Sequence, residues 1–166
     1  MGTSADSVET VARGAFPALA AKVGVVEATI NLATVSAELV ADGEGVLDDG
    51  DIIQCLSLAQ GTVVLAAGIE IMTTVVGATA LPVGLGITGG DVDAFVTEVD
   101  IGSSTSYVAT DHLPQNQAVG PVVIGDGAAG ATTDTIDILI GTQTGDVTAG
   151  VLRVWAVIAD MADMSG

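Results

Sequence analysis

The sequence predicts an all-β protein, an antiparallel β-sandwich of jelly-roll type that begins with a short N-terminal arm or helix. Glycine is frequent, at 22 of 166 residues, and proline is rare, at 4. Hydrophobic residues make up 49% of the chain and aromatic residues only 2%, so small and β-branched side chains must fill the core. About eight to ten short alternating runs, separated by Gly, Asp and Asn turns, are typical of such a sandwich.

The arm or short helix is expected at residues 1–22. Asp6 and Glu9 have the spacing of a capping box, which favours a helix start. The apolar residues that would line one side of this helix are Val8, Val11 and Ala12. The alternative is an extended arm that becomes ordered on a neighbouring subunit. In both cases Phe16 and Leu19 are the apolar anchors.

The sandwich domain is expected at residues 23–162, followed by a C-terminal tail at 163–166. A first strand at 23–32 leads into a brief helical turn at 37–40 and then an acidic, glycine-rich connection. Residues 101–117 are the most polar segment and form the predicted long exposed loop. The other strands are predicted at 52–58, at 61–76 as one long strand or as a strand broken at 66–68, at 82–87, within 88–99 and within 118–134.

Glycine alternates with larger apolar residues in the strand predicted at 82–87, where Gly84 and Gly86 share one face. That face carries no side chains. It can therefore receive large side chains or another stretch of backbone.

Residues 133–161 read as a β-hairpin around which the rest of the chain is organised. The first strand places Ile136, Ile138 and Ile140 on one face, which requires a core. In the second strand one face is apolar throughout and the other is apolar apart from Arg153. A strand with two apolar faces belongs to the middle of a sandwich or to a subunit interface.

Arg153 and Trp155 lie on the same face of that last strand, and both residue types are enriched at interface hot spots. A satisfied core with a salt bridge at its edge explains the same pattern. Together with Phe16 and Leu19, these residues are the candidate interface residues.

The charge balance excludes two classes of partner. Only three Lys and Arg residues stand against 21 Asp and Glu, which gives a formal net charge of −18. Binding to nucleic acid depends on cations that neutralise phosphates, so we expect no nucleic-acid partner. For the same reason we expect no anionic membrane partner. Two uncharged runs, 52–69 and 71–90, contain too many Gly, Thr and Gln residues for lipid-spanning helices, and we expect buried strands there.

No residue pattern indicates catalysis, and we expect neither enzymatic activity nor a cofactor. His112 follows Asp111 in the polar loop, but adjacent loop residues do not make a base and its orienting partner. Cys55 lies in an apolar strand as a reduced core residue. The loop hydroxyls at 103–106 have no nucleophile-elbow context.

Acidic clusters raise the question of calcium, which prefers several oxygen ligands. Asp48, Asp49 and Asp51 form one cluster, and Asp91 and Asp93 follow a glycine in another. Neither completes a calcium-loop motif, so we interpret both as solvated acidic turns and expect no bound metal. The Gly-Asp-Gly sequence at 125–127 is also a turn signal, because no lysine or helix start follows it.

Two blocks of the sequence resemble a family of small structural proteins of tailed bacteriophages. The first block has the matching residues Asp51, Ile53, Leu56, Leu58, Gly61, Thr62, Val63, Val64, Leu65, Ile69, Glu70 and Ile71. The second has the matching residues Arg153, Val154, Trp155, Ala156, Ala159 and Asp160. The resemblance covers roughly residues 50–161.

The resemblance implies a capsid decoration, or cement, protein: a β-sandwich, usually a homotrimer, that binds the major capsid protein on the outer surface of a phage head. The predicted properties of the chain agree, because a small sandwich that is half apolar favours an oligomer. The alternatives are a calcium- or glycan-binding β-sandwich module and a head-fibre or tail component of a virion. A near absence of aromatic residues counts against the glycan-binding module.

Overall fold

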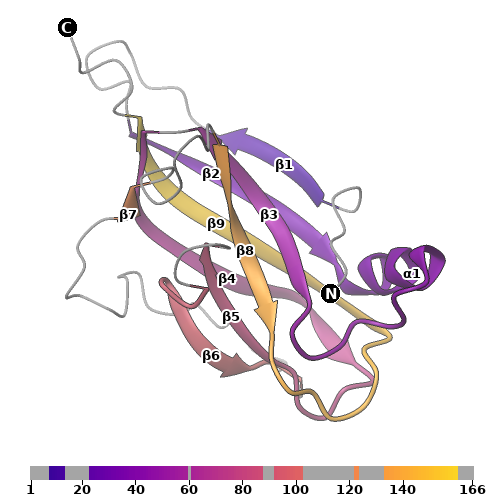
Figure 1. Cartoon of the computed structure of the whole chain (residues 1–166). Helices are drawn as coiled ribbons and strands as arrows, with labels where there is room; N and C mark the ends of the chain where they lie inside the picture. The colour runs from indigo at the N-terminus through magenta and orange to yellow at the C-terminus, as the bar shows by residue number, and fades with distance from the viewer. Residues whose placement is uncertain are drawn as a thin grey trace, which may run out of the picture.

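The structure, a computed structural model, describes residues 8–13, 23–59, 61–87, 92–102, 122–123 and 133–160. In that part of the chain nine strands and one helix form a two-layered β-sandwich (Figure 1), which confirms the predicted all-β class. The elements are β1 (Val8–Arg13), β2 (Val23–Asn31), α1 (Leu32–Asp42), β3 (Ile52–Ala59), β4 (Thr62–Val76), β5 (Pro82–Ile87), β6 (Val96–Asp100), β7 (Val122–Val123), β8 (Thr133–Ile140) and β9 (Ala149–Asp160).

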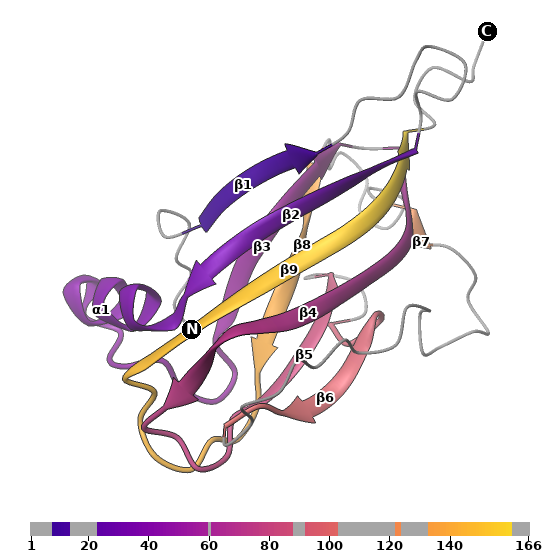
Figure 2. The ribbon, with the colours of Figure 1, turned by 180° about the vertical axis from the view of Figure 1, so that it is seen from behind.

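The strands form two antiparallel sheets. Sheet A has the order β1-β2-β9-β4-β7 and sheet B the order β3-β8-β5-β6. Figure 2 shows β2, β9 and β4 side by side, with sheet B behind them. Most connections cross from one sheet to the other. When β1 is set aside, the remaining eight strands form two four-stranded sheets in jelly-roll order, as predicted.

The predicted hairpin at 133–161 is wrong, because β8 and β9 lie in different sheets. β8 pairs with β3 and β5, whereas β9 pairs with β2 and β4, so each strand has both edges occupied by other partners. The segment between them runs along the connection from β4 to β5. There the Thr79 N–H donates to Thr144 O at 2.8 Å and the Thr144 N–H donates to Ala80 O at 2.9 Å. The segment is therefore a crossover and not a hairpin turn.

At the N-terminus the helical alternative is wrong for the residues that the structure describes. Val8–Arg13 is strand β1, which pairs antiparallel with β2 in the register Val8↔Ile30 to Arg13↔Val25. A helix this short gains little stability by itself, whereas the edge of β2 offers a complete ladder of hydrogen bonds. Phe16 and Leu19 lie outside the described residues.

The predicted helical turn is a longer helix, α1. The Asn31 side chain caps its start by accepting hydrogen bonds from Ala33 N at 3.1 Å and Thr34 N at 3.4 Å. Gly43 ends it in a left-handed conformation (φ 84°), and its N–H donates to Val40 O at 3.2 Å. The helix buries one side against the sandwich, through Leu32, Val35, Ser36 and Leu39.

The core lies between the two sheets and contains the predicted inward faces. Ile136, Ile138 and Ile140 of β8 are each 0% exposed, and they belong to one hydrophobic cluster with the inward residues of β9. The inward residues of β9 in this cluster are Leu152, Val154 and Ala156. The period-two pattern thus predicted which face of each strand is buried.

The bare face predicted on β5 does receive another stretch of backbone. A Cβ atom at Gly84 would lie 3.5 Å from Val96 O and 3.7 Å from Val92 O. The segment before β6 is further fixed by the Phe95 N–H, which donates to Leu85 O at 2.9 Å. Phe95 itself is 1% exposed and is among the largest fully buried side chains of the described residues.

The two uncharged runs fall on β3, β4 and β5, as expected. In the part of the chain that the structure describes, no helix has the length and apolar character needed to cross a membrane. Of the two alternatives for the long strand, the continuous strand is confirmed and the break at 66–68 does not occur. β4 is continuous, and its pairing with β9 has register shifts between Val64 and Ala66, between Ile71 and Thr73 and between Thr73 and Val76.

Candidate subunit-contact face

The outward side chains of β2, β9 and β4 form one continuous surface, which we call the sheet A face. It comprises Val23, Val25, Glu27 and Thr29 of β2, Arg153, Trp155 and Val157 of β9, and Ala66, Gly68 and Glu70 of β4. The alternate residues of β2 and β9 point into the core; Ala28, Ile30 and Val154, for example, are each 0% exposed.

The register of the three strands arranges this face in rows. Trp155 lies opposite Glu27 on one side and Gly68 on the other. Arg153 occupies the next row, opposite Thr29 and Glu70. The predicted pair of Arg153 and Trp155 is therefore on one outward face. Directly opposite residues on an antiparallel pair have Cβ atoms about 4.5–5.5 Å apart, so each row is a set of contacting neighbours.

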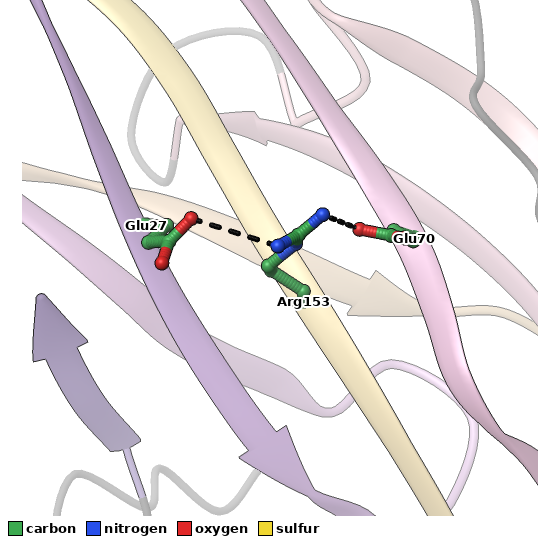
Figure 3. Close-up of polar contacts among 3 residues, drawn as sticks. All are labelled: Glu27, Glu70 and Arg153. Atoms are coloured by element: carbon green, nitrogen blue, oxygen red, sulfur yellow. Dashed lines mark ion pairs between the residues drawn. The ribbon is translucent and has the colours of Figure 1, made fainter. Parts of the chain in front are cut away.

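Arg153 forms ion pairs with both neighbouring strands (Figure 3). Its Nη2 pairs with Glu70 Oε2 across the β9–β4 ladder, and its Nη1 lies 3.8 Å from Glu27 Oε2 on β2. The Arg153 side chain is 34% exposed, whereas the Glu27 and Glu70 side chains are 16% and 14% exposed. The two carboxylates are thus largely removed from water, and both pair with one guanidinium.

Trp155 rests on Gly68. A Cβ atom at Gly68 would lie 2.7 Å from Cζ2, 2.9 Å from Cε2 and 3.1 Å from Nε1 of the indole. The absence of a side chain at this position lets the ring approach the backbone of β4. The glycine that suggested a break in the strand therefore makes room for Trp155 instead.

The remaining residues of the sheet A face are apolar or small. Val157 lies between Val25 and Ala66 in the row beyond Trp155. Val23, at the start of β2, and Val25 are 45% and 39% exposed. Leu65 and Met72 of β4 are also exposed, at 38% and 51%, and both lie at the register shifts of that strand. The apolar part of the sheet A face itself consists of Val23, Val25 and Val157, with Ala66 beside them.

Cys55 is a buried core residue, as predicted. The residue is 3% exposed, and its thiol donates to Ile53 O at 3.1 Å, at the irregularity between Gln54 and Leu56. Burial raises the pKa of the Cys55 thiol far above its ordinary value, and the charge of Asp137 raises it further. The thiol stays protonated and is a poor nucleophile.

Carboxylates of the cluster at Asp48, Asp49 and Asp51 bind the backbone of their own turn. Asp51 Oδ2 accepts from Asp48 N at 2.9 Å, and Asp48 Oδ1 accepts from Asp49 N at 2.8 Å. Among the described residues no group of three or more His, Cys, Asp and Glu side chains is placed to hold a metal ion. The other predicted positions lie outside the described residues; they are Asp91, His112, Asp111, the hydroxyls at 103–106 and the turn at 125–127.

Glu27 and Gly68 are neighbours of the candidate interface residues that sequence reasoning missed. Glu70 was part of the resemblance, but nothing along the chain connected it to Arg153. All three become neighbours of the Arg153–Trp155 pair through the register of β2, β9 and β4, which residue patterns within one strand do not contain.

No protein-family model matches this chain, and neither does any curated protein sequence. Among solved structures, the chain is similar to a chain of the cyanophage Pam1 capsid asymmetric unit, with a TM-score of 0.56 and 15% sequence identity. The similarity covers 82% of this chain and 84% of that chain. At this identity the likeness shows a shared fold, which is the fold that the resemblance to tailed-phage structural proteins implied.

Proposed function

We propose that this chain is a non-enzymatic structural protein of a virion, a decoration or cement protein that binds the outer surface of a phage head as an oligomer and stabilises it. The observation that carries the proposal is the jelly-roll fold shared, over 82% of the chain, with a chain of a phage capsid. The two residue blocks that resemble tailed-phage structural proteins support the same function.

The chemistry of the described residues supports a structural role. The Cys55 thiol is buried and protonated, and carboxylates of the acidic turn at Asp48 to Asp51 hold the backbone of that turn. Arg153 is the only Lys or Arg residue whose side chain the structure describes, and it pairs with Glu27 and Glu70. The polar groups of the sheet A face therefore stabilise one another.

The net charge supports a position outside the head. A chain with a formal charge of −18 is repelled by packaged nucleic acid, whose phosphates carry the same sign. The major capsid protein is the partner that this location requires. A homotrimer, as the resemblance implies, would give the chain several points of attachment and would raise its effective affinity for the head.

Reconstitution with heads of the phage that encodes the chain tests this function. We expect the purified protein to sediment with empty heads in a fixed ratio to the major capsid protein, to be accessible to antibody on intact heads, and to raise the temperature at which heads open. Heads that neither bind the protein nor gain stability from it would contradict the proposal. Recovery of the protein with tails or fibres alone would favour the fibre or tail alternative.

A further inference from the structure

The cations of the chain can neutralise only a small part of its carboxylates. The 21 Asp and Glu residues stand against Arg13, Lys22 and Arg153, so a net charge of −18 remains even when all three cations are paired. Arg153, the only Lys or Arg residue whose side chain the structure describes, is already engaged by Glu27 and Glu70. The remaining charge must therefore be balanced by ions of the surrounding medium.

The exposed carboxylates are spread over distant parts of the surface. They lie on α1, in the connection after it, in and before β6, and in the crossover between β8 and β9. Those that the structure describes as exposed are Asp42, Glu44, Asp48, Asp49, Asp93, Glu98, Asp100 and Asp146. Figure 1 and Figure 2 show α1 and β6 on opposite sides of the sandwich. The repulsion therefore acts across the whole domain, and one bound ion could not remove it.

We propose that the folded state of this chain depends on salt and is adapted to a saline medium, in which diffuse monovalent cations screen its self-repulsion. A folded domain of 166 residues has a radius of gyration of about 15 Å, and its unfolded chain one of about 43 Å. At 0.01 M salt the Debye length is about 30 Å, so all carboxylates of the folded domain repel one another. At 1 M it is about 3 Å, and only close neighbours interact. Because unfolding moves the charges apart, repulsion favours the unfolded chain at low salt.

Salt also weakens attraction, and the balance of the two effects decides the direction of the change. The attraction comes from the ion pairs of Arg153, whose partners Glu27 and Glu70 have side chains only 16% and 14% exposed. Partly buried pairs are screened less than exposed charges. The repulsion comes from a net charge of −18, much of it on exposed side chains. Salt therefore removes more repulsion than attraction and should stabilise the fold.

Thermal unfolding of the full chain, followed by circular dichroism, tests the proposal at about 0.01, 0.1 and 1 M NaCl. We expect Tm to rise by about 15 °C or more over this range, and KCl to act as NaCl does. Guanidinium chloride gives a sharper result, because it is both a salt and a denaturant. Below about 0.3 M it should stabilise the protein in low-salt buffer, whereas urea should only destabilise it. A Tm that is the same at all three NaCl concentrations would overturn the proposal.

A charge-reversed variant tests the cause of the effect. Asp49→Lys together with Asp146→Lys changes two exposed positions by two charges each and lowers the net charge from −18 to −14. We expect a higher Tm than wild type at 0.01 M NaCl and a similar Tm at 1 M, where the charges are screened. The matched control is Asp49→Glu together with Asp146→Glu, which keeps the charge and should follow wild type. An unchanged salt dependence in the lysine variant would contradict screening as the cause.

Two further results would overturn the proposal. If about 1 mM CaCl2 in low-salt buffer gave the whole stabilisation that 1 M NaCl gives, a bound ion would be responsible and not a diffuse atmosphere. If the salt dependence disappeared when the protein concentration was raised about tenfold, the repulsion would act between subunits and not within the chain. Salt dependence of the fold is measured without phage heads, so its outcome is independent of the proposed function.

Discussion

Arg153 on β9 and Glu70 on β4 lie directly opposite each other and form an ion pair across the ladder, with Glu27 of β2 placed 3.8 Å from the other guanidinium nitrogen. The arginine thus links three adjacent strands of sheet A on their outer surface (Figure 3). Its removal has a larger consequence than the loss of one surface salt bridge, since two mostly buried carboxylates would both lose this guanidinium.

We expect Arg153→Met to lower the free energy of unfolding by about 2 kcal/mol, which is between the values for exposed and buried pairs. The methionine keeps much of the apolar stem, so the loss reports mainly the uncompensated charges. Urea denaturation at neutral pH measures it. The control is the triple variant that adds Glu27→Gln and Glu70→Gln, which should recover most of the loss. A single variant as stable as wild type would show that the two ion pairs contribute nothing.

Gly68→Ala should destabilise the fold by about 1–3 kcal/mol, the usual cost of overpacking. The added Cβ would lie 2.7 Å from Cζ2 of Trp155, and a rigid indole cannot bend away as a flexible chain would. Thermal denaturation measures the loss of stability, and tryptophan emission reports whether the indole of Trp155 is displaced. The matched control is Gly84→Ala, whose nearest contacts are 3.5 Å or longer and which should be tolerated.

The contact between Gly68 and Trp155 also allows a double-mutant cycle. If the cost of Gly68→Ala arises from the indole, it should largely disappear in a Trp155→Ala background, although that background is itself destabilised by about 2–4 kcal/mol. A cost that persists without the indole would place its origin in the backbone of β4 and contradict the seating of Trp155 on Gly68.

Alternation along single strands predicted burial well and predicted pairing poorly. Ile136, Ile138 and Ile140 face the core, and Arg153 and Trp155 share an outward face, because a period of two is a local property of an extended chain. Which strands become neighbours is not local. The hairpin expected at 133–161 is a crossover between sheets because β3 and β5 occupy both edges of β8, and they lie far from it in sequence.

Two segments near the N-terminus, Asn31 and residues 8–13, show a second limit of sequence patterns. Asn31 fits a strand end as well as a helix cap, and only its hydrogen bonds to Ala33 and Thr34 show that it starts α1. Residues 8–13 fit a helix by spacing, but the open edge of β2 selects a strand. In both cases a contact formed by the folded chain decided between two conformations that the sequence allows.

Asn31→Ala should therefore cost about 1 kcal/mol through loss of the helix cap, and Asn31→Asp should cost little, because aspartate caps equally well. Chemical denaturation measures both. The helix content by circular dichroism should fall in the alanine variant more than in the aspartate variant. Equal stability of the alanine variant and wild type would mean that α1 is held by its buried side alone.

Because the Cys55 thiol is buried, we expect the protein to lose stability in alkali. Its folded-state pKa is raised by burial above the ordinary value of 9.0, so at high pH the unfolded chain releases this proton and the folded chain retains it. The stability that the neutral thiol contributes is complete below about pH 8 and falls as the pH rises above 9, by up to about 1.4 kcal/mol per pH unit.

We expect the difference in unfolding free energy between wild type and Cys55→Ala to be constant from about pH 6 to 8 and to shrink from about pH 9 to 10.5. Other groups that titrate in this range are common to both proteins and cancel in the difference. A difference that stays constant to pH 10.5 would mean that water reaches the thiol in the folded state, and rapid alkylation of native Cys55 by iodoacetamide would show the same access directly.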